Sequence, residues 1–243
     1  MLPESIRLPV EIMSQPDEST CGPTCLHAIY RYWGEKETLK EVIGRTRRLE
    51  KGGTFAVFLA CDALLKGYQA TIYTYNLMVF DPTWFTTPGV DIAERLQRQT
   101  KFKRNSRIRL ATEGYLEFLA LGGVLRFVNL SRYLIRGILR RKLPILTGLS
   151  STYLYRVARE YGANDTPDDI KGFPAGHFVI IAGYNRPDRT VLVADPYTPN
   201  PYSNSPGLYW INVERVVAAI LLGIVTHDAN LLVISPRRSE VKK

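Results

Sequence analysis

The sequence predicts an α+β fold in which amino-terminal helices pack on a carboxyl-terminal antiparallel sheet. Segments with helical spacing dominate the first third of the chain, and short alternating segments separated by turn residues dominate the last third. Of the 243 residues, 45% are hydrophobic and 23% are charged, as in ordinary globular domains. We therefore expect one domain over residues 1–243.

The first third contains three predicted helices. Residues 21–33 form the first, with Pro23 tolerated near its start and Gly34 at its end. Residues 37–48 form the second, and its basic last turn suits the carboxyl end of a helix. Residues 55–66 form the third, which is apolar along most of its length.

The middle of the chain carries the whole basic excess. The net charge is +9, while 13 Lys and Arg against two Glu place +11 on residues 95–142 alone. Helical spacing over 90–99 and 124–142 predicts a basic, mostly helical insertion at about 90–142. This concentration of positive charge attracts anionic partners. Its arginines can equally form a solvated helical face and neutralise carboxylates elsewhere in the fold.

The remaining elements are predicted strands with one helix among them. One strand precedes the basic segment, and the others follow it in an antiparallel meander. The strands are expected at 68–75, 143–149, 177–184, 190–195, 208–213 and 230–235, the helix at 214–222, and a polar loop at 162–176.

Cys21 stands where a loop leads into the first helix, in the segment Gln15-Pro-Asp-Glu-Ser-Thr-Cys21-Gly-Pro-Thr-Cys25. The unpaired N–H groups of the first turn and the positive end of the helix dipole stabilise a thiolate there. The same N–H groups can bind an oxyanion, and the side-chain amide of Gln15 can supply a second donor. The alternative is that Cys21 is a small buried hydrophobic residue, as free cysteines usually are.

A histidine and a carboxylate flank a predicted hairpin. The strands that carry His177 and Asp195 are joined by the turn residues 185–189, and the midpoint between 177 and 195, residue 186, falls inside that turn. We therefore expect them to be direct cross-strand neighbours, with the carboxylate accepting the imidazole N–H and fixing its tautomer. A bulge in either strand would shift this register.

The chain order Gln, Cys, His, Asp resembles that of papain-like cysteine peptidases. The motifs are most similar to those of bacteriocin-processing peptidases, which cut after double-glycine leaders, and of the free-standing relatives of these peptidases. They are Gln15, Cys21-Gly-Pro-Thr-Cys25-Leu26, Gly53-Thr54, Gly67-Tyr68, His177-Phe-Val, Gly183-Tyr184 and Ala194-Asp195-Pro196. The resemblance implies a papain-like fold, with Cys21 as nucleophile, His177 as base, Asp195 as orienting acid and Gln15 as oxyanion donor.

These residues predict a cysteine hydrolase that cleaves a peptide or amide bond. One alternative is an acyltransferase that passes the same thioester to an amine. The other is a non-catalytic module that binds anionic partners through the basic insertion, where residues 124–142 have the amphipathic form of an interfacial helix. The apolar side of that helix can equally be core, and nucleic acid is not the expected partner.

Cofactors, metals and disulfides are not expected. The sequence has no glycine-rich phosphate-binding loop, and His227 with Asp228 supplies too few ligands for a metal, so capping is expected there. Three cysteines are too few for a disulfide framework, and no apolar run reaches the ~18 residues of a membrane span. A cytoplasmic protein is predicted, with Cys25 packed behind Cys21 and Cys61 in the core.

Overall fold

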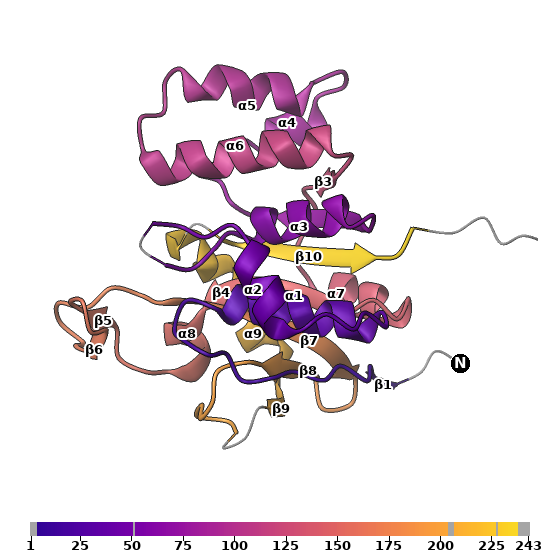
Figure 1. Cartoon of the computed structure of the whole chain (residues 1–243), viewed down its shortest axis with the longest axis vertical. Coiled ribbons are helices and arrows are strands. Elements are labelled where there is room, and N and C mark those ends of the chain that lie inside the picture. The colour runs from indigo at the N-terminus through magenta and orange to yellow at the C-terminus, as the bar shows by residue number, and fades with distance from the viewer. Residues whose placement is uncertain (1–3, 51, 204–206, 227, 238–243) are drawn as a thin grey trace, which may run out of the picture.

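The computed structural model describes residues 4–50, 52–203, 207–226 and 228–237 (Figure 1). An eight-stranded sheet, antiparallel at all but one pair of neighbouring strands, carries helices packed against it. This arrangement confirms the predicted α+β class. The central strand β4 (Ile145–Ser150) is buried at every residue, which shows that other elements cover both faces of the sheet there.

The strand order is β3-β2-β10-β4-β7-β8-β9, with β1 paired to β7. Strands β7, β8 and β9 form the predicted meander, but the last strand, β10, lies between β2 and β4 rather than at the edge. The other sheet strands are β1 (Ser5–Arg7), β2 (Gln69–Thr74), β3 (Val124–Arg126), β7 (Gly176–Asn185), β8 (Thr190–Asp195), β9 (Gly207–Asn212) and β10 (Asn230–Ser235), and a separate ribbon pairs β5 (Glu160–Tyr161) with β6 (Thr166–Pro167).

The three helices predicted in the first third are all present. They are α1 (Cys21–Tyr32), α2 (Leu39–Arg45) and α3 (Ala56–Leu65), and the later helices are α4 (Thr83–Thr86), α5 (Ile92–Thr100), α6 (Ser106–Ala120), α7 (Arg132–Arg140), α8 (Ser151–Tyr155) and α9 (Val213–Leu222), followed by a 3₁₀ turn at Gly223–Thr226. Within the described residues, no helix combines the length and the apolar character that crossing a membrane requires.

The basic segment occupies two separate places in the fold. Helices α5 and α6 stack beyond α3 at one end of the molecule, whereas α7 packs against β4 and β7 (Figure 1). The helix predicted over 124–142 is wrong at its start, because residues 124–126 pair with β2 as the parallel strand β3. Residues 106–120, for which the pattern predicted no element, form α6.

The apolar side of α7 is core. Ile135, Ile138 and Leu139 are buried, and the helix contacts the sheet and α9 on that side. The surface that an interfacial helix would insert into a membrane is therefore already covered by the protein.

Asp228 caps helix α3 from the far end of the chain. The N-cap residue Phe55 offers no side-chain acceptor, and Oδ2 of Asp228 accepts the backbone N–H of Ala56 at 2.8 Å. Asn230 donates to the other carboxylate oxygen. Burial raises the pKa of Asp228 to about 7, and these two hydrogen bonds only partly oppose it. The sequence predicts that this residue caps a local loop, whereas the structure shows that it caps a helix far away in the sequence. His227 lies outside the described residues.

Asp228→Asn is expected to flatten the pH dependence of stability. The unfolded carboxyl ionises near its ordinary pKa of 3.8 and the folded one near 7, so stability falls as pH rises between these values. We expect this decline to be on the order of 2–4 kcal/mol in the wild type. The asparagine oxygen still accepts the Ala56 N–H and carries no charge, so the part of the decline that comes from Asp228 disappears.

Urea unfolding between pH 4 and pH 8 measures this effect. Asp169→Asn makes the same chemical change at an exposed position and should keep the wild-type slope. An Asp228→Asn slope equal to that of the wild type would contradict the prediction.

Candidate active site

Cys21 is the first residue of α1, and no side chain caps this helix. The hydroxyl of the N-cap residue Thr20 is engaged by the backbone of Asp17: it donates to the carbonyl at 3.0 Å and accepts the N–H at 3.3 Å. The carboxylate of Asp17 in turn accepts the N–H and O–H of Ser19. Because the loop bonds to itself, the N–H groups at the start of α1 receive no side-chain acceptor from the part of the chain that the structure describes.

Close packing holds the start of α1 against strand β7. A Cβ at Gly22 would lie 2.6 Å from Cγ2 of Thr54 and 3.2 Å from the ring of Phe178, so this approach requires glycine. One turn further on, Sγ of Cys25 donates to the carbonyl of Phe178 at 3.3 Å. Since His177 directly precedes Phe178, this packing brings the start of α1 beside the imidazole.

The structure brings Cys21, His177 and Asp195 together. Nε2 of His177 lies 2.8 Å from Oδ1 of Asp195, and the two residues are 8% and 0% exposed. Cys21 also raises the pKa of this imidazole, which places its sulfur within interaction range of the ring. Because Nε2 faces the carboxylate, Nδ1 is the ring nitrogen left for the sulfur.

The electrostatics favour a charged imidazole. Burial lowers the pKa of His177, but the charge and hydrogen bond of Asp195, together with Cys21, outweigh burial and raise the pKa to about 10. Burial raises the pKa of Asp195, while His177 and hydrogen bonds from hydroxyl groups lower it below its ordinary value. An imidazolium–carboxylate pair is therefore the stable form at neutral pH, and an imidazolium beside a sulfur is the arrangement that activates a cysteine nucleophile.

Two tyrosine hydroxyls complete the surroundings of Asp195. Tyr155 on α8 donates to Oδ2 at 2.7 Å and Tyr209 on β9 donates at 2.6 Å. The backbone N–H of Tyr197 donates to Oδ1 at 3.0 Å. No motif in the sequence predicts this role for Tyr155 or Tyr209. Alternation along β9 could have placed Tyr209 on the inner face, whereas nothing in the sequence signals Tyr155.

The predicted direct pairing of His177 with Asp195 is wrong, although the contact exists. A bulge in β7 shifts the register, so that Ile180 pairs with Ala194. Continuing this register places Val179 opposite Asp195 and leaves His177 on the diagonal. Diagonal neighbours share a face and remain within reach of a long side chain, which explains the surviving hydrogen bond.

Gln15 lies beside this group. Its backbone N–H donates to the carbonyl of Pro196 at 2.9 Å, which ties it to the end of β8. Its Nε2 donates to the carbonyl of Asp17 at 3.0 Å, and Oε1 is buried without a hydrogen-bond donor among the described residues. An amide nitrogen has two hydrogens, so one remains for an incoming oxygen.

A cleft of about 730 Å³ opens at this site, and Gln15 and His177 line it. Cys21, which is 7% exposed, contacts His177 without lining the cleft itself. Three carboxylates, Glu18, Glu160 and Asp165, lie close together here: burial raises the pKa of Glu160, and the charges of the other two raise it further. Among the described residues, no group of three His, Cys, Asp or Glu is placed to hold a metal ion.

The other two cysteines are buried, as predicted. Burial raises the pKa of Cys25 well above its ordinary value, and it raises the pKa of Cys61 to about 12. Neither sulfur has a histidine partner among the described residues: Cys25 bonds Phe178, and Cys61 lies 3.7 Å from the carbonyl of Gly114.

No family model matches the chain, and no curated protein matches it. Solved structures resemble it at low identity. A Bacillus anthracis protein described as a C39-like peptidase aligns with a TM-score of 0.49 and 12% identity, covering 97% of this chain and 99% of that one. Xylellain, a cysteine protease from Xylella fastidiosa, gives 0.46 and 14%, covering 98% and 88%. The peptidase domain of Streptococcus ComA, a bi-functional ABC transporter, gives 0.43 and 10%, covering 94% and 99%.

Tyr155→Phe and Tyr209→Phe are each expected to lower the reactivity of Cys21. Each removes one donor from a buried carboxylate, a loss of about 1.5–3 kcal/mol, and loosens the group that orients His177. The rate of alkylation of Cys21 should fall by about tenfold in either variant.

Tyr153→Phe is the matched control, since Tyr153 lies on the same helix and is 45% exposed. Its alkylation rate should equal that of the wild type. Wild-type rates in both buried-tyrosine variants would show that the hydroxyls do not support the site.

Proposed function

We propose that this protein is a cysteine peptidase of the papain-like type. The observation that carries the proposal is the buried His177–Asp195 pair at 2.8 Å, with the side chain of Cys21 close enough to the same ring to raise its pKa. A histidine buried only to stabilise a core would not need both a carboxylate on one ring nitrogen and a cysteine sulfur beside the ring. The uncapped start of α1 and the amide of Gln15 add donors for a developing oxyanion.

In the acylation step, the sulfur of Cys21 attacks the carbonyl carbon of the scissile amide. A C–S bond forms, and the carbonyl electron pair moves to oxygen, where the α1 N–H groups and Gln15 stabilise it. The intermediate collapses, the C–N bond breaks, and the imidazolium of His177 protonates the leaving amine. Asp195 keeps the ring oriented throughout.

In the second step, water hydrolyses the thioester. His177, now neutral, takes a proton from the water as its oxygen attacks the acyl carbon. The C–S bond then breaks, the acid product leaves, and the thiolate–imidazolium pair is restored. An amine in place of water would give transfer instead of hydrolysis. Only free acid as product, with and without an added amine, would exclude transfer.

Selective alkylation tests the activation of Cys21. Iodoacetamide at mildly acidic pH should label Cys21 in the native protein and leave Cys25 and Cys61 unlabelled, because burial holds both of these as thiols. Peptide mapping identifies the labelled residue. His177→Ala should abolish the selectivity. Equal, slow labelling of all three thiols in the folded protein would contradict the proposed nucleophile.

Hydrolysis of a mixed peptide library tests the activity itself. Cys21→Ala should remove all cleavage, and Gln15→Ala should lower kcat by about tenfold to a hundredfold, with KM little changed, because an oxyanion donor acts in the transition state. Gln97→Ala, at an exposed position of α5, is the control and should leave kcat unchanged. Cleavage that persists in Cys21→Ala would overturn the proposed mechanism.

A further inference from the structure

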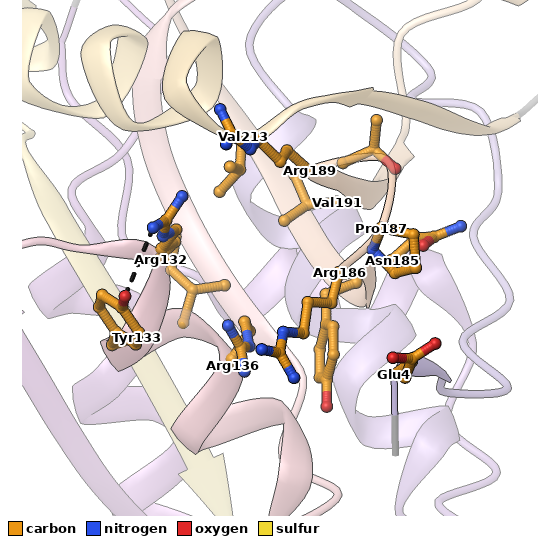
Figure 2. A pocket seen from close by; sticks show the side chains of 13 residues that line it. Glu4, Arg132, Tyr133, Arg136, Asn185, Arg186, Pro187, Arg189, Val191 and Val213 are labelled. Atoms are coloured by element: carbon orange, nitrogen blue, oxygen red, sulfur yellow. Dashed lines mark hydrogen bonds between the residues drawn. The ribbon is translucent and has the colours of Figure 1, made fainter. Parts of the chain in front are cut away.

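A second concave site lies between helix α7 and the turn that joins β7 to β8 (Figure 2). Its volume is about 730 Å³, within the range of small-molecule sites. Asn185 lines it, and this residue is eight positions along β7 from His177, or about 26 Å along an extended strand. The second site is therefore separate from the candidate active site.

Four arginines line this pocket, and they come from two distant parts of the sequence. Arg132 and Arg136 stand one turn apart on α7, while Arg186 and Arg189 belong to the β7–β8 turn. In Figure 2 their side chains surround the space between these two elements. We call this group the arginine pocket. Only its α7 half lies in the basic segment that the sequence analysis singled out.

Most of the positive charge of the arginine pocket has no carboxylate partner among the described residues. Arg132 has a carboxylate at ion-pair distance, Glu214 at 3.8 Å, and the other three arginines have none among the described residues. Glu4 lines the pocket without forming an ion pair with any described residue. Asp188, in the turn itself, accepts a hydrogen bond from the side chain of Asn185. An anionic ligand would relieve the repulsion between the arginines.

Two tyrosines hold Arg136 in place. Its guanidinium lies 5.5 Å from the ring centre of Tyr184 and 5.7 Å from that of Tyr133. Its Nε is buried without an acceptor among the described residues, which is costly for a charged donor. The pKa of Tyr133 is lowered, first by a hydrogen bond from Arg132 and the charge of that residue, and then by the charges of Arg136 and Arg186. Three of the four arginines therefore act on the same side chain.

The shape and charge of the pocket favour a compact ligand. Its floor contains the buried side chains of Ile135, Val191 and Val213, and the exposed arginines of the turn rise beside it. A nucleic acid duplex or a bilayer needs an extended surface, whereas a pocket of this size encloses a small molecule. A guanidinium group binds phosphate oxygens through two N–H groups at once, and the three arginines without a carboxylate partner supply positive charge for adjacent phosphate groups.

We propose that the arginine pocket binds a soluble small molecule that carries two or more linked phosphate groups. Inorganic pyrophosphate is the simplest probe of this chemistry, and titration calorimetry on the full chain at low, fixed salt measures its binding. We expect saturable binding at one site, weakened about tenfold or more in Arg136→Gln and in Arg186→Gln.

Arg98→Gln is the matched control, because Arg98 is an exposed arginine on α5, outside the pocket. It should bind pyrophosphate like the wild type. Arg186 is exposed on the turn, so its variant should fold normally, and equal thermal unfolding of all variants verifies this. A nucleoside diphosphate and vesicles containing phosphatidic acid distinguish a soluble phosphate ester from a lipid headgroup as the source of the phosphate.

Three results would overturn the proposal. They are the absence of saturable pyrophosphate binding, binding that Arg136→Gln and Arg186→Gln leave unchanged, and binding of citrate as tight as that of pyrophosphate, since citrate offers carboxylates alone. Binding to the vesicles without binding of either soluble phosphate would assign the arginines to a membrane surface instead.

Discussion

The hydrogen bond between His177 and the buried carboxylate of Asp195 is the interaction on which the candidate site depends. An ionised carboxylate that is fully removed from water is stable only when its oxygens are paired with charge and hydrogen-bond donors. Asp195 receives the imidazole, two tyrosine hydroxyls and one backbone N–H. Helix α8, strand β9 and the segment after β8 must therefore all be in place before the imidazole is held in one orientation.

The second requirement is the contact between two layers of the fold. His177 and Asp195 belong to the sheet, and the sulfur of Cys21 belongs to the helix packed on it. Gly22 allows the close approach of the two layers. A packed interior does not deform continuously, so a small displacement of α1 would separate the sulfur from the ring. The reactive arrangement is thus a property of core packing as much as of the three side chains.

The arginine pocket is organised on the opposite principle. At Asp195 the protein supplies every partner that the charge needs, which fixes the residue and closes it to ligands. At the arginine pocket three guanidinium groups have no carboxylate among the described residues, and the pocket remains open. Compensated charge is typical of a group that positions another residue, and uncompensated charge in a pocket is typical of a site for an anion.

The sequence alone determined the class of the fold and the approximate positions of most helices and strands, since these follow from local periodicity and turn chemistry. It also placed Cys21 at the start of a helix and put His177 and Asp195 on adjoining strands, whereas the grouping of all three residues was implied by the family resemblance. Tertiary structure decided what depends on contacts between distant segments. The bulge in β7 determines how His177 is aligned with Asp195. The hydroxyl of Tyr155, on the short helix α8, donates to Asp195, and Arg186 lines the same pocket as the arginines of α7. Strand β10 lies in the middle of the sheet, where its backbone N–H and C=O groups pair with β2 on one side and β4 on the other. No pattern along the chain specifies these two partners.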